Sequence, residues 1–229
     1  PLTIGAGGVY CPVADSLVKR TYDEELVDKE KKHYSAAFRQ YWKGVEGIED
    51  KMGAIEFHYV DGVLPGYFWI FPIGGGVSNV GFGMALADIY AHDKKLRSMQ
   101  EFVIHGRFAE RFKGAELVKG SSKGWQLPLG SPRKAKHLPR RAFGNGCMLV
   151  GDSASLVDPF TGEGIGNALL SAKLAISHFD KIVDRRGFPI EKGMKYQKKI
   201  WTELGKELTN SYKLQNYTKR RWLVNLFVK

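Results

Sequence analysis

The strongest constraint on the fold is a glycine-rich stretch that separates a short apolar run from a helical pattern. Residues 146–150, GCMLV, are apolar and bounded by glycine, which predicts a buried strand. From about Ile165 to Val183 the apolar residues recur at near-helical spacing. Residues 151–164, GDSASLVDPFTGEG, therefore predict a loop that follows the carboxyl end of a strand and leads into a helix.

The glycines of this loop do not follow a known phosphate-binding spacing. A dinucleotide fingerprint, G-x-G-x-x-G, needs a third glycine where GEGIGN has Asn167 and where the earlier loop GAGGVY has Tyr10. No G-x-x-x-x-G-K-[ST] segment occurs either. A helix N-terminus with free N–H groups still favours an anionic or electron-rich ligand. Asp152 is placed to accept hydrogen bonds from ligand hydroxyls, such as those of a ribityl chain.

Residues 2–51 contain a second strand-to-loop pattern and a charged segment. Residues 2–4 lead into glycines and predict another strand, whereas residues 22–51 are charge-rich and predict a partly helical, mostly exposed segment. Arg39 and Lys43 beside Trp42 are interpreted as a solvated helix face, with binding of an anionic headgroup as the alternative. His33 lies in the same charged segment and is predicted to be solvated, and none of the histidines has the spacing of a metal site.

The middle of the chain predicts antiparallel sheet. Residues 53–87 alternate apolar and polar side chains between DG, PG and GGG breaks, which predicts a meander of strands. Residues 93–112 return to a helical pattern with Asp93 as the N-cap, and residues 115–132 predict one or two further strands. We therefore expect an α/β (α+β) fold in which one domain is interrupted by another. The expected parts are a strand and loop at 1–20, an antiparallel-sheet domain at 21–138, a strand, loop and helix at 139–182, and a basic helical region at 183–229.

Composition limits where the protein is expected in the cell and what it is expected to bind. The chain has two cysteines, Cys11 and Cys147, too few for a disulfide framework or a cysteine-based metal cluster, and no apolar run approaches the roughly 20 residues of a membrane span. We expect a cytoplasmic protein, peripheral to the membrane at most. Of the net charge of +11, residues 181–229 supply +9, with thirteen Lys or Arg against four Asp or Glu.

This basic region also carries aromatic residues. We interpret it as an amphipathic helix pair whose aromatics pack inward, with contact to an anionic membrane surface or to nucleic acid as alternatives; nucleic acid is the less expected partner. The aromatics are Tyr196, Trp201, Tyr212, Tyr217 and Trp222.

Three blocks together resemble the geranylgeranyl reductase family of FAD-dependent oxidoreductases, which belongs to the group with a p-hydroxybenzoate hydroxylase-like (PHBH-like) fold. IGAGGVYCPV at 4–13 resembles that family's G-A-D-G-x-x-S-x-V segment, and PGYFWIFPIGGGVSNVGFG at 65–83 resembles its P-x-x-Y-x-W-x-F-P segment. GCMLVGDSASLVDPFTGEGIGNAL at 146–169 resembles its G-D segment, the most specific of the three. The match covers nearly all of residues 2–180. The resemblance implies a PHBH-like FAD-binding fold with an inserted antiparallel substrate domain and C-terminal helices.

The resemblance also implies site residues. Tyr67, Trp69, Phe71 and Pro72 would line the substrate pocket, and Asp158 would pass beside the isoalloxazine. The catalytic residues stay unassigned, with Tyr67 as the candidate proton donor. The implied FAD-binding residues are Gly8, Gly151, Asp152, Pro159, Gly162, Gly164, Ile165, Gly166 and Asn167.

The implied activity is hydride transfer from reduced FAD to a carbon–carbon double bond of an isoprenoid lipid, with NAD(P)H or another donor reducing the flavin. The alternatives are a monooxygenase or halogenase of the same fold, or a non-enzymatic module that binds a membrane or an acidic partner. Halogenases of this group usually carry W-x-W-x-I-P, whereas this chain has Tyr67 and Phe71 at the first and fifth positions.

The first block departs from the family pattern. Gly7, Cys11 and Ala14 replace its aspartate, serine and arginine. The family's N-terminal dinucleotide-binding unit is missing, and the chain starts at Pro1 in a strand that needs partners. We therefore expect a C-terminal piece of a longer protein that binds FAD poorly by itself.

Overall fold

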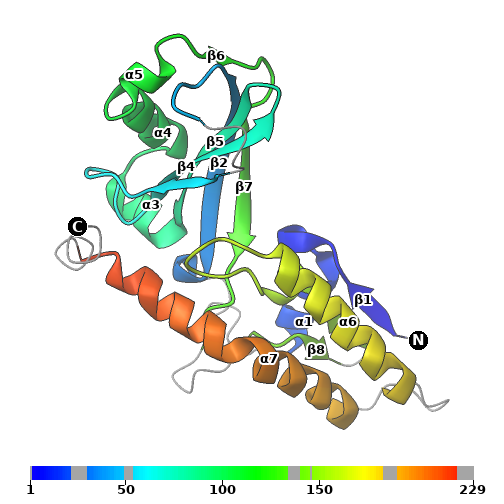
Figure 1. Ribbon diagram of the computed structural model, residues 1–229. Helices are drawn as coiled ribbons and strands as arrows, with labels where there is room; N and C mark the ends of the chain where they lie inside the picture. The colour runs from blue at the N-terminus through cyan, green and yellow to red at the C-terminus, as the bar shows by residue number, and fades with distance from the viewer. Residues whose placement is uncertain are drawn as a thin grey trace. The chain divides into compact units, whose positions relative to one another are not determined.

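The computed structural model describes residues 2–21, 30–48, 54–133, 140–144, 146–182 and 190–220. The chain divides into two compact units (Figure 1). The first unit comprises residues 1–34 and 127–217, and the second comprises residues 35–126 and 218–229.

The first unit has a small sheet with helices packed against it. Its strand order is β1-β9-β8: β1 is parallel to β9, with Thr3 opposite Cys147, and β9 is antiparallel to β8. The strands expected at 2–4 and 146–150 and the helix from about Ile165 are confirmed. The elements are β1 (Thr3–Gly5), η1 (Gly8–Tyr10), α1 (Pro12–Thr21), η2 (Lys31–His33), β8 (Phe143–Gly144), β9 (Cys147–Leu149), η3 (Gly151–Ala154), α6 (Ile165–Ile182) and α7 (Ile190–Tyr217).

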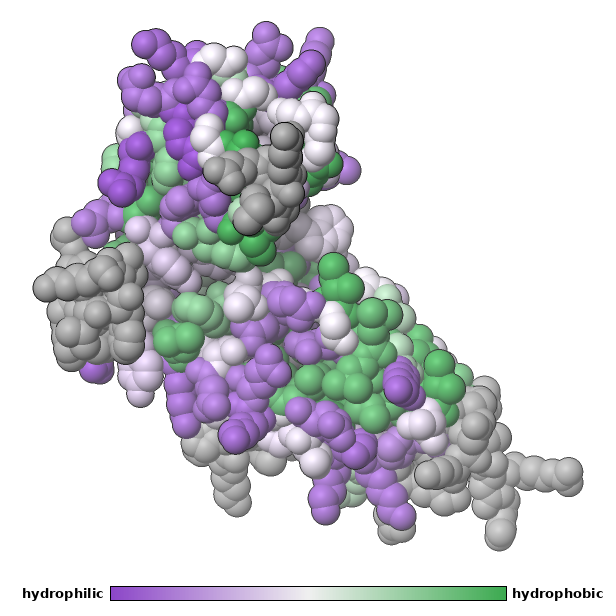
Figure 2. All heavy atoms as spheres, in the orientation of Figure 1, coloured by the Kyte–Doolittle hydropathy of each residue, from purple (hydrophilic) through white to green (hydrophobic). Residues whose placement is uncertain are grey.

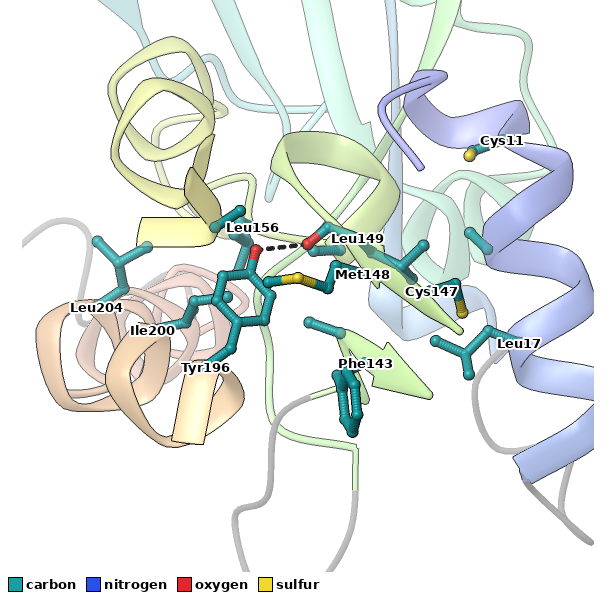
Figure 3. Close-up of a cluster of buried hydrophobic side chains, with 14 of the residues drawn as sticks. Cys11, Leu17, Phe143, Cys147, Met148, Leu149, Leu156, Tyr196, Ile200 and Leu204 are labelled. Atoms are coloured by element: carbon teal, nitrogen blue, oxygen red, sulfur yellow. Dashed lines mark hydrogen bonds between the residues drawn. The ribbon is translucent and has the colours of Figure 1, made fainter. Parts of the chain in front are cut away.

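The core of the first unit lies between β9 and the helices. In α7, one stripe of side chains four residues apart enters this core, which is the pattern of a helix with a single buried face. Figure 3 shows Tyr196 and Ile200 of this stripe beside Met148 of β9. The described part of the basic region forms one helix, α7, instead of the expected pair. Its aromatic side chains differ in exposure: Tyr196 is buried, whereas Tyr217 is 52% exposed. Trp222 lies outside the described residues. The stripe comprises Tyr196, Ile200, Leu204 and Leu208.

Tyr196 ties α7 to the central strand. Its ring is fully buried and its hydroxyl donates to Leu149 O at 2.7 Å (Figure 3). Burial raises the pKa of the hydroxyl, so it stays protonated as a donor. We expect Tyr196→Phe to lower the free energy of unfolding by about 1–2 kcal/mol, because the buried carbonyl loses its phenolic partner. Denaturant unfolding measures this change, and Tyr212→Phe, on the same helix, is the control expected to change it by less than about 0.5 kcal/mol.

The second unit is a six-stranded sheet with helices on one face. The strand order is β3-β4-β5-β2-β6, with β7 also pairing with β2, and the pairs among β2 to β6 are antiparallel. The expected meander over 53–87 and the later strands are confirmed. The elements are β2 (Tyr34–Lys43), β3 (Glu56–His58), β4 (Tyr67–Gly74), β5 (Val77–Ala85), α3 (Leu86–His92), α4 (Leu96–His105), α5 (Ala109–Phe112), β6 (Glu116–Leu117) and β7 (Lys123–Pro128).

In the strands of the second unit, successive side chains point alternately into the core and to the opposite face of the sheet. Phe68 and Ile70 of β4 and Phe82 of β5 are fully buried and join Met99 and Val103 of α4 in one cluster. Because successive side chains of a strand point to opposite faces, the odd-numbered residues of β4 lie on the side away from this core.

Two expectations for this unit were wrong. Residues 34–43, predicted within a partly helical segment, form the strand β2, and Trp42 packs into the core against Phe112, with ring centroids 5.3 Å apart. Asp93 does not begin a helix: it follows α3 in a left-handed conformation, with φ of 49°, and α4 begins at Leu96. A short polar side chain that tolerates this conformation occurs at either end of a helix, so residue type alone does not show whether Asp93 begins a helix or ends one.

An apolar stripe of α6 is exposed. Ile165, Leu169 and Ile176 are 79%, 69% and 65% exposed, and Figure 2 shows hydrophobic surface over this helix. The opposite side of α6, including Ala175 and Ser171, is buried. In the described part of the chain, no helix is long and apolar enough to cross a membrane.

Candidate functional site

The two glycine loops of the first unit lie together. Both follow the carboxyl ends of paired parallel strands, β1 and β9, so the sheet brings them to one edge. Ser153 Oγ of η3 donates to Gly8 O of η1 at 3.2 Å. Gly8 has a φ of +72° and open space around its missing Cβ, so its backbone is accessible to a ligand.

Gly151 allows α6 to approach the end of β9 closely. Its φ is +55°, and an added Cβ would lie 3.0 Å from the Cβ of Ala168 on α6. Its N–H donates to Ser171 Oγ at 2.9 Å. Gly151 therefore joins the strand end to the helix, and its own N–H is already used.

Asp158 shapes the loop before α6. This carboxylate is 6% exposed, and its Oδ1 accepts from the N–H groups of Phe160 and Thr161 at 2.9 and 2.8 Å. The next carbonyl, Pro159 O, accepts from Gln215 Nε2 of α7 at 2.6 Å. The loop is thus fixed from within and from α7, which keeps its backbone preorganised.

The N-terminus of α6 is formed by the residues that the sequence singled out. Gly162 has a φ of +75°, and Asn167 Nδ2 donates to Leu156 O at 2.7 Å, which anchors the first turn to the loop. Glu163 Oε1 accepts from Gly166 N at 2.7 Å, so the helix caps one of its own donors. The N–H groups of Gly164, just before the helix, and of Ile165 and Asn167 in its first turn lie at the end where the helix dipole favours negative charge.

Asp152 is the residue of this site that its neighbours do not satisfy. Its side chain accepts no hydrogen bond from the described residues, and its Oδ1 lies 3.4 Å from where a Cβ on Gly164 would stand. Burial raises the pKa of this carboxyl. A half-buried carboxylate without partners, beside a glycine backbone and a helix N-terminus, fits a ligand that brings hydroxyl groups, and FAD carries such hydroxyls on its ribityl chain.

The second unit holds a cluster of rings that we call the aromatic face: Phe57, Tyr59, Tyr67, Trp69 and Phe71. Tyr67, Trp69 and Phe71 alternate along β4 on the side away from the core, and Phe57 of β3 lies opposite Trp69. Ring centroids of Phe57 are 5.6 Å from Tyr67 and 5.1 Å from Phe71. Trp69 stacks on Phe71 at 6.0 Å, and Tyr59 contacts Tyr67 at 6.2 Å.

Glycines of β5 let the indole of Trp69 lie flat on the sheet. Gly81 is opposite Trp69, and an added Cβ there would lie 2.1 Å from the indole Cζ2. Trp69 Nε1 donates to Asn79 Oδ1 at 3.2 Å, which fixes the ring in this position. The aromatic face is therefore a preformed apolar wall.

Pro72 does not belong with the other predicted lining residues. Pro72 is the residue after Phe71 in β4 and is opposite Ser78 of β5. On its other side Ser78 is opposite Trp42 of β2, which packs against the core. The sequence motif placed Pro72 beside Phe71, but the period of two puts its ring on the other face. Phe57 and Tyr59 are the ring residues that sequence reasoning missed. Among the described residues no His, Cys, Asp and Glu cluster has the arrangement of a metal site.

Comparison with known proteins agrees with this geometry. No protein-family model matches the chain. The chain is 30% identical over 145 residues to digeranylgeranylglycerophospholipid reductase from Thermoplasma acidophilum, covering 62% of the chain and 33% of that protein. It is 31% identical over 180 residues to menaquinone reductase from Mycobacterium tuberculosis, covering 77% and 40%. The chain thus spans a third to two fifths of the length of these relatives.

Solved structures show the same fold. A geranylgeranyl bacteriochlorophyll reductase-like protein from Thermoplasma acidophilum superposes with a TM-score of 0.76 at 21% identity, covering 94% of the chain and 49% of that protein. A probable FAD-dependent monooxygenase from Pseudomonas aeruginosa has a TM-score of 0.57 at 16% identity and is covered to 59% by the whole chain. The chain is therefore a homologue of the geranylgeranyl reductases and has part of the PHBH-like fold of FAD-dependent oxidoreductases.

Proposed function

We propose that the chain is part of an FAD-dependent oxidoreductase that reduces carbon–carbon double bonds of an isoprenoid lipid. The first unit would hold the flavin at its glycine loops, and the second would hold the lipid on the aromatic face. The relatives named as reductases of a digeranylgeranyl lipid and of menaquinone support an isoprenoid substrate. NAD(P)H or another donor would reduce the flavin.

The observation that carries the proposal is Asp152. Its unsatisfied carboxylate lies beside Gly164 and the N-terminus of α6. A bound, reduced FAD would supply the hydride, which is the chemistry of the cofactor itself. Asp152 would accept hydrogen bonds from the ribityl hydroxyls, and the N–H groups of Gly164 and Ile165 would stabilise negative charge on the reduced ring.

The aromatic face would position the lipid and exclude water. Phe57, Tyr67, Trp69 and Phe71 offer ring surface for an apolar chain and no competing charge. The main contribution of the protein to a hydride transfer from reduced flavin is to hold the alkene in a fixed position. Tyr67 is the hydroxyl-bearing residue of β4 on this wall and is our candidate proton donor.

Asp152→Asn tests the flavin site. In the whole protein that contains this chain, we expect FAD to be retained about tenfold less tightly, because the amide replaces a charged acceptor. In the flavin-free chain we expect the opposite effect on stability. Since burial raises the pKa of Asp152, the ionised carboxylate costs stability at neutral pH, and the amide should raise the free energy of unfolding.

The measurements are flavin content after dialysis and denaturant unfolding at pH 7. Asp93→Asn is the matched control, because Asp93 is exposed in the second unit and asparagine tolerates its left-handed backbone. Unchanged FAD retention in Asp152→Asn would contradict the proposed flavin site.

A further inference from the structure

The aromatic face continues across the sheet onto β2. Trp69 is opposite Gly81, and Gly81 is opposite Arg39 in the next strand pair. Directly opposed residues of antiparallel strands project from the same face. Phe57, Trp69, Gly81 and Arg39 therefore form one row across four strands, aromatic at one end and cationic at the other.

Arg39 is held in place by neutral groups. Its guanidinium lies 4.2 Å from the ring centroid of Tyr41, and its Nη1 donates to Ser121 O at 2.8 Å. It has no ion pair with any described residue. A guanidinium has five N–H donors, so most of them stay available while the group is oriented.

Among the described residues, no carboxylate lies opposite Arg39 on β5 or forms an ion pair with it. Lys43 projects from the same face of β2, but the residue opposite it is Glu116 of β6. Glu56 of β3 projects to the other face and pairs with Arg111 at 2.7 Å. Arg39 has only Gly81 opposite it on β5.

We propose that Arg39 binds the phosphate headgroup of an isoprenoid lipid whose chain lies on the aromatic face. This inference rests on the proposed function for the isoprenoid and adds the class of its headgroup. The three strand spacings between Phe57 and Arg39 place these residues about 14 Å apart, at about 4.8 Å per spacing. The indole of Trp69 covers Gly81, the residue directly opposite Arg39, so the rings extend to the strand beside the guanidinium.

Charge complementarity selects a phospholipid-like substrate over a neutral one. An arginine that is already oriented can make two parallel bonds to phosphate, which strengthens binding and orients the headgroup. A neutral isoprenoid quinone would leave this half-buried cation without a counter-ion. Arg39 would then determine both the headgroup and the direction in which the chain lies on the rings.

The test compares three soluble probes on the flavin-free chain: farnesyl monophosphate, farnesol and inorganic phosphate. Calorimetry or tryptophan fluorescence gives each Kd. We expect farnesyl monophosphate to bind about tenfold more tightly than farnesol, and Arg39→Gln to remove this preference while farnesol binding stays unchanged. Arg39→Lys should keep much of the preference. Lys43→Gln, which removes a charge from the same face, should change it by less than about twofold.

Several results would overturn the inference. A preference that survives Arg39→Gln would assign the headgroup to another cation, and inorganic phosphate binding as tightly as the ester would make free phosphate the ligand. Farnesol serves as the folding control, since a variant that binds it normally retains the aromatic face. The measurement needs no flavin, so failure of FAD binding in the whole protein would remove the proposed reaction without touching this result.

Discussion

Gly81→Ala is expected to displace the indole of Trp69 and to disrupt the aromatic face. The added Cβ would lie 2.1 Å from Cζ2 and 2.5 Å from Cε2 of an indole that Asn79 also holds. Overfilling such a site usually costs about 1–3 kcal/mol, more than the roughly 0.5–1 kcal/mol that alanine gains over glycine in a strand. We expect the second unit to lose about 1–3 kcal/mol of stability and farnesol binding to weaken at least tenfold.

Gly83→Ala is the matched control, two residues along the same strand and on the same face. Its added Cβ would lie 3.5 Å from the indole Cζ3, which is ordinary contact. We expect this variant to keep the native stability within about 0.5 kcal/mol and to bind farnesol normally. Denaturant unfolding and the emission spectrum of the chain report both effects. Equal losses in the two variants would show that the flat indole is not what the glycines of β5 protect.

The sequence predicted the first unit well where one local signal decided the outcome. The apolar run before Gly151 and the helical spacing after Ile165 gave β9 and α6 nearly at their observed bounds. The role of Gly151 was not visible, because it depends on Ala168 and Ser171, which only the folded helix brings close.

The sequence failed for β2 because its alternation has no clean polar face. Phe38, Gln40 and Trp42 face one side, and Arg39 and Tyr41 the other, so both sides mix apolar and polar groups. Missing this strand also hid the place of Arg39 beside the rings, since the row from Phe57 to Arg39 joins residues that are far apart in sequence. Strand register is a tertiary property that charge patterning cannot supply.

His33 was also predicted to be solvated, and the structure shows a fully buried side chain in the first unit. Its Nδ1 lies 2.8 Å from Ser131 Oγ, which in turn accepts from Arg133 Nη1 at 3.2 Å. Ser131 Oγ can accept from Arg133 and form its second hydrogen bond with Nδ1 of a neutral imidazole, whose other nitrogen, Nε2, is buried with no partner among the described residues.

The buried His33 predicts that the folded protein loses stability at a pH well above the range in which ordinary carboxylates titrate. Burial, with added repulsion from Arg133 and Lys32, lowers the pKa of His33 from 6.5 to about 3. Between these values the unfolded chain binds a proton that the folded chain does not. The free energy of unfolding should therefore be unaffected above pH 6.5 and fall by as much as about 1.4 kcal/mol per pH unit below it.

His33→Asn should flatten this dependence, because an amide oxygen can accept from Ser131 without titrating. Denaturant unfolding between pH 5 and pH 7.5 separates the effect from carboxylates such as Glu56, whose pKa is lowered by Arg111 and which titrates in more acid solution. His105→Asn, a change at an exposed histidine of α4, should keep the native slope. A slope that persists in His33→Asn would place the acid-sensitive group elsewhere. A flattened slope would assign the acid sensitivity to His33, whose carbonyl oxygen accepts from Leu129 N.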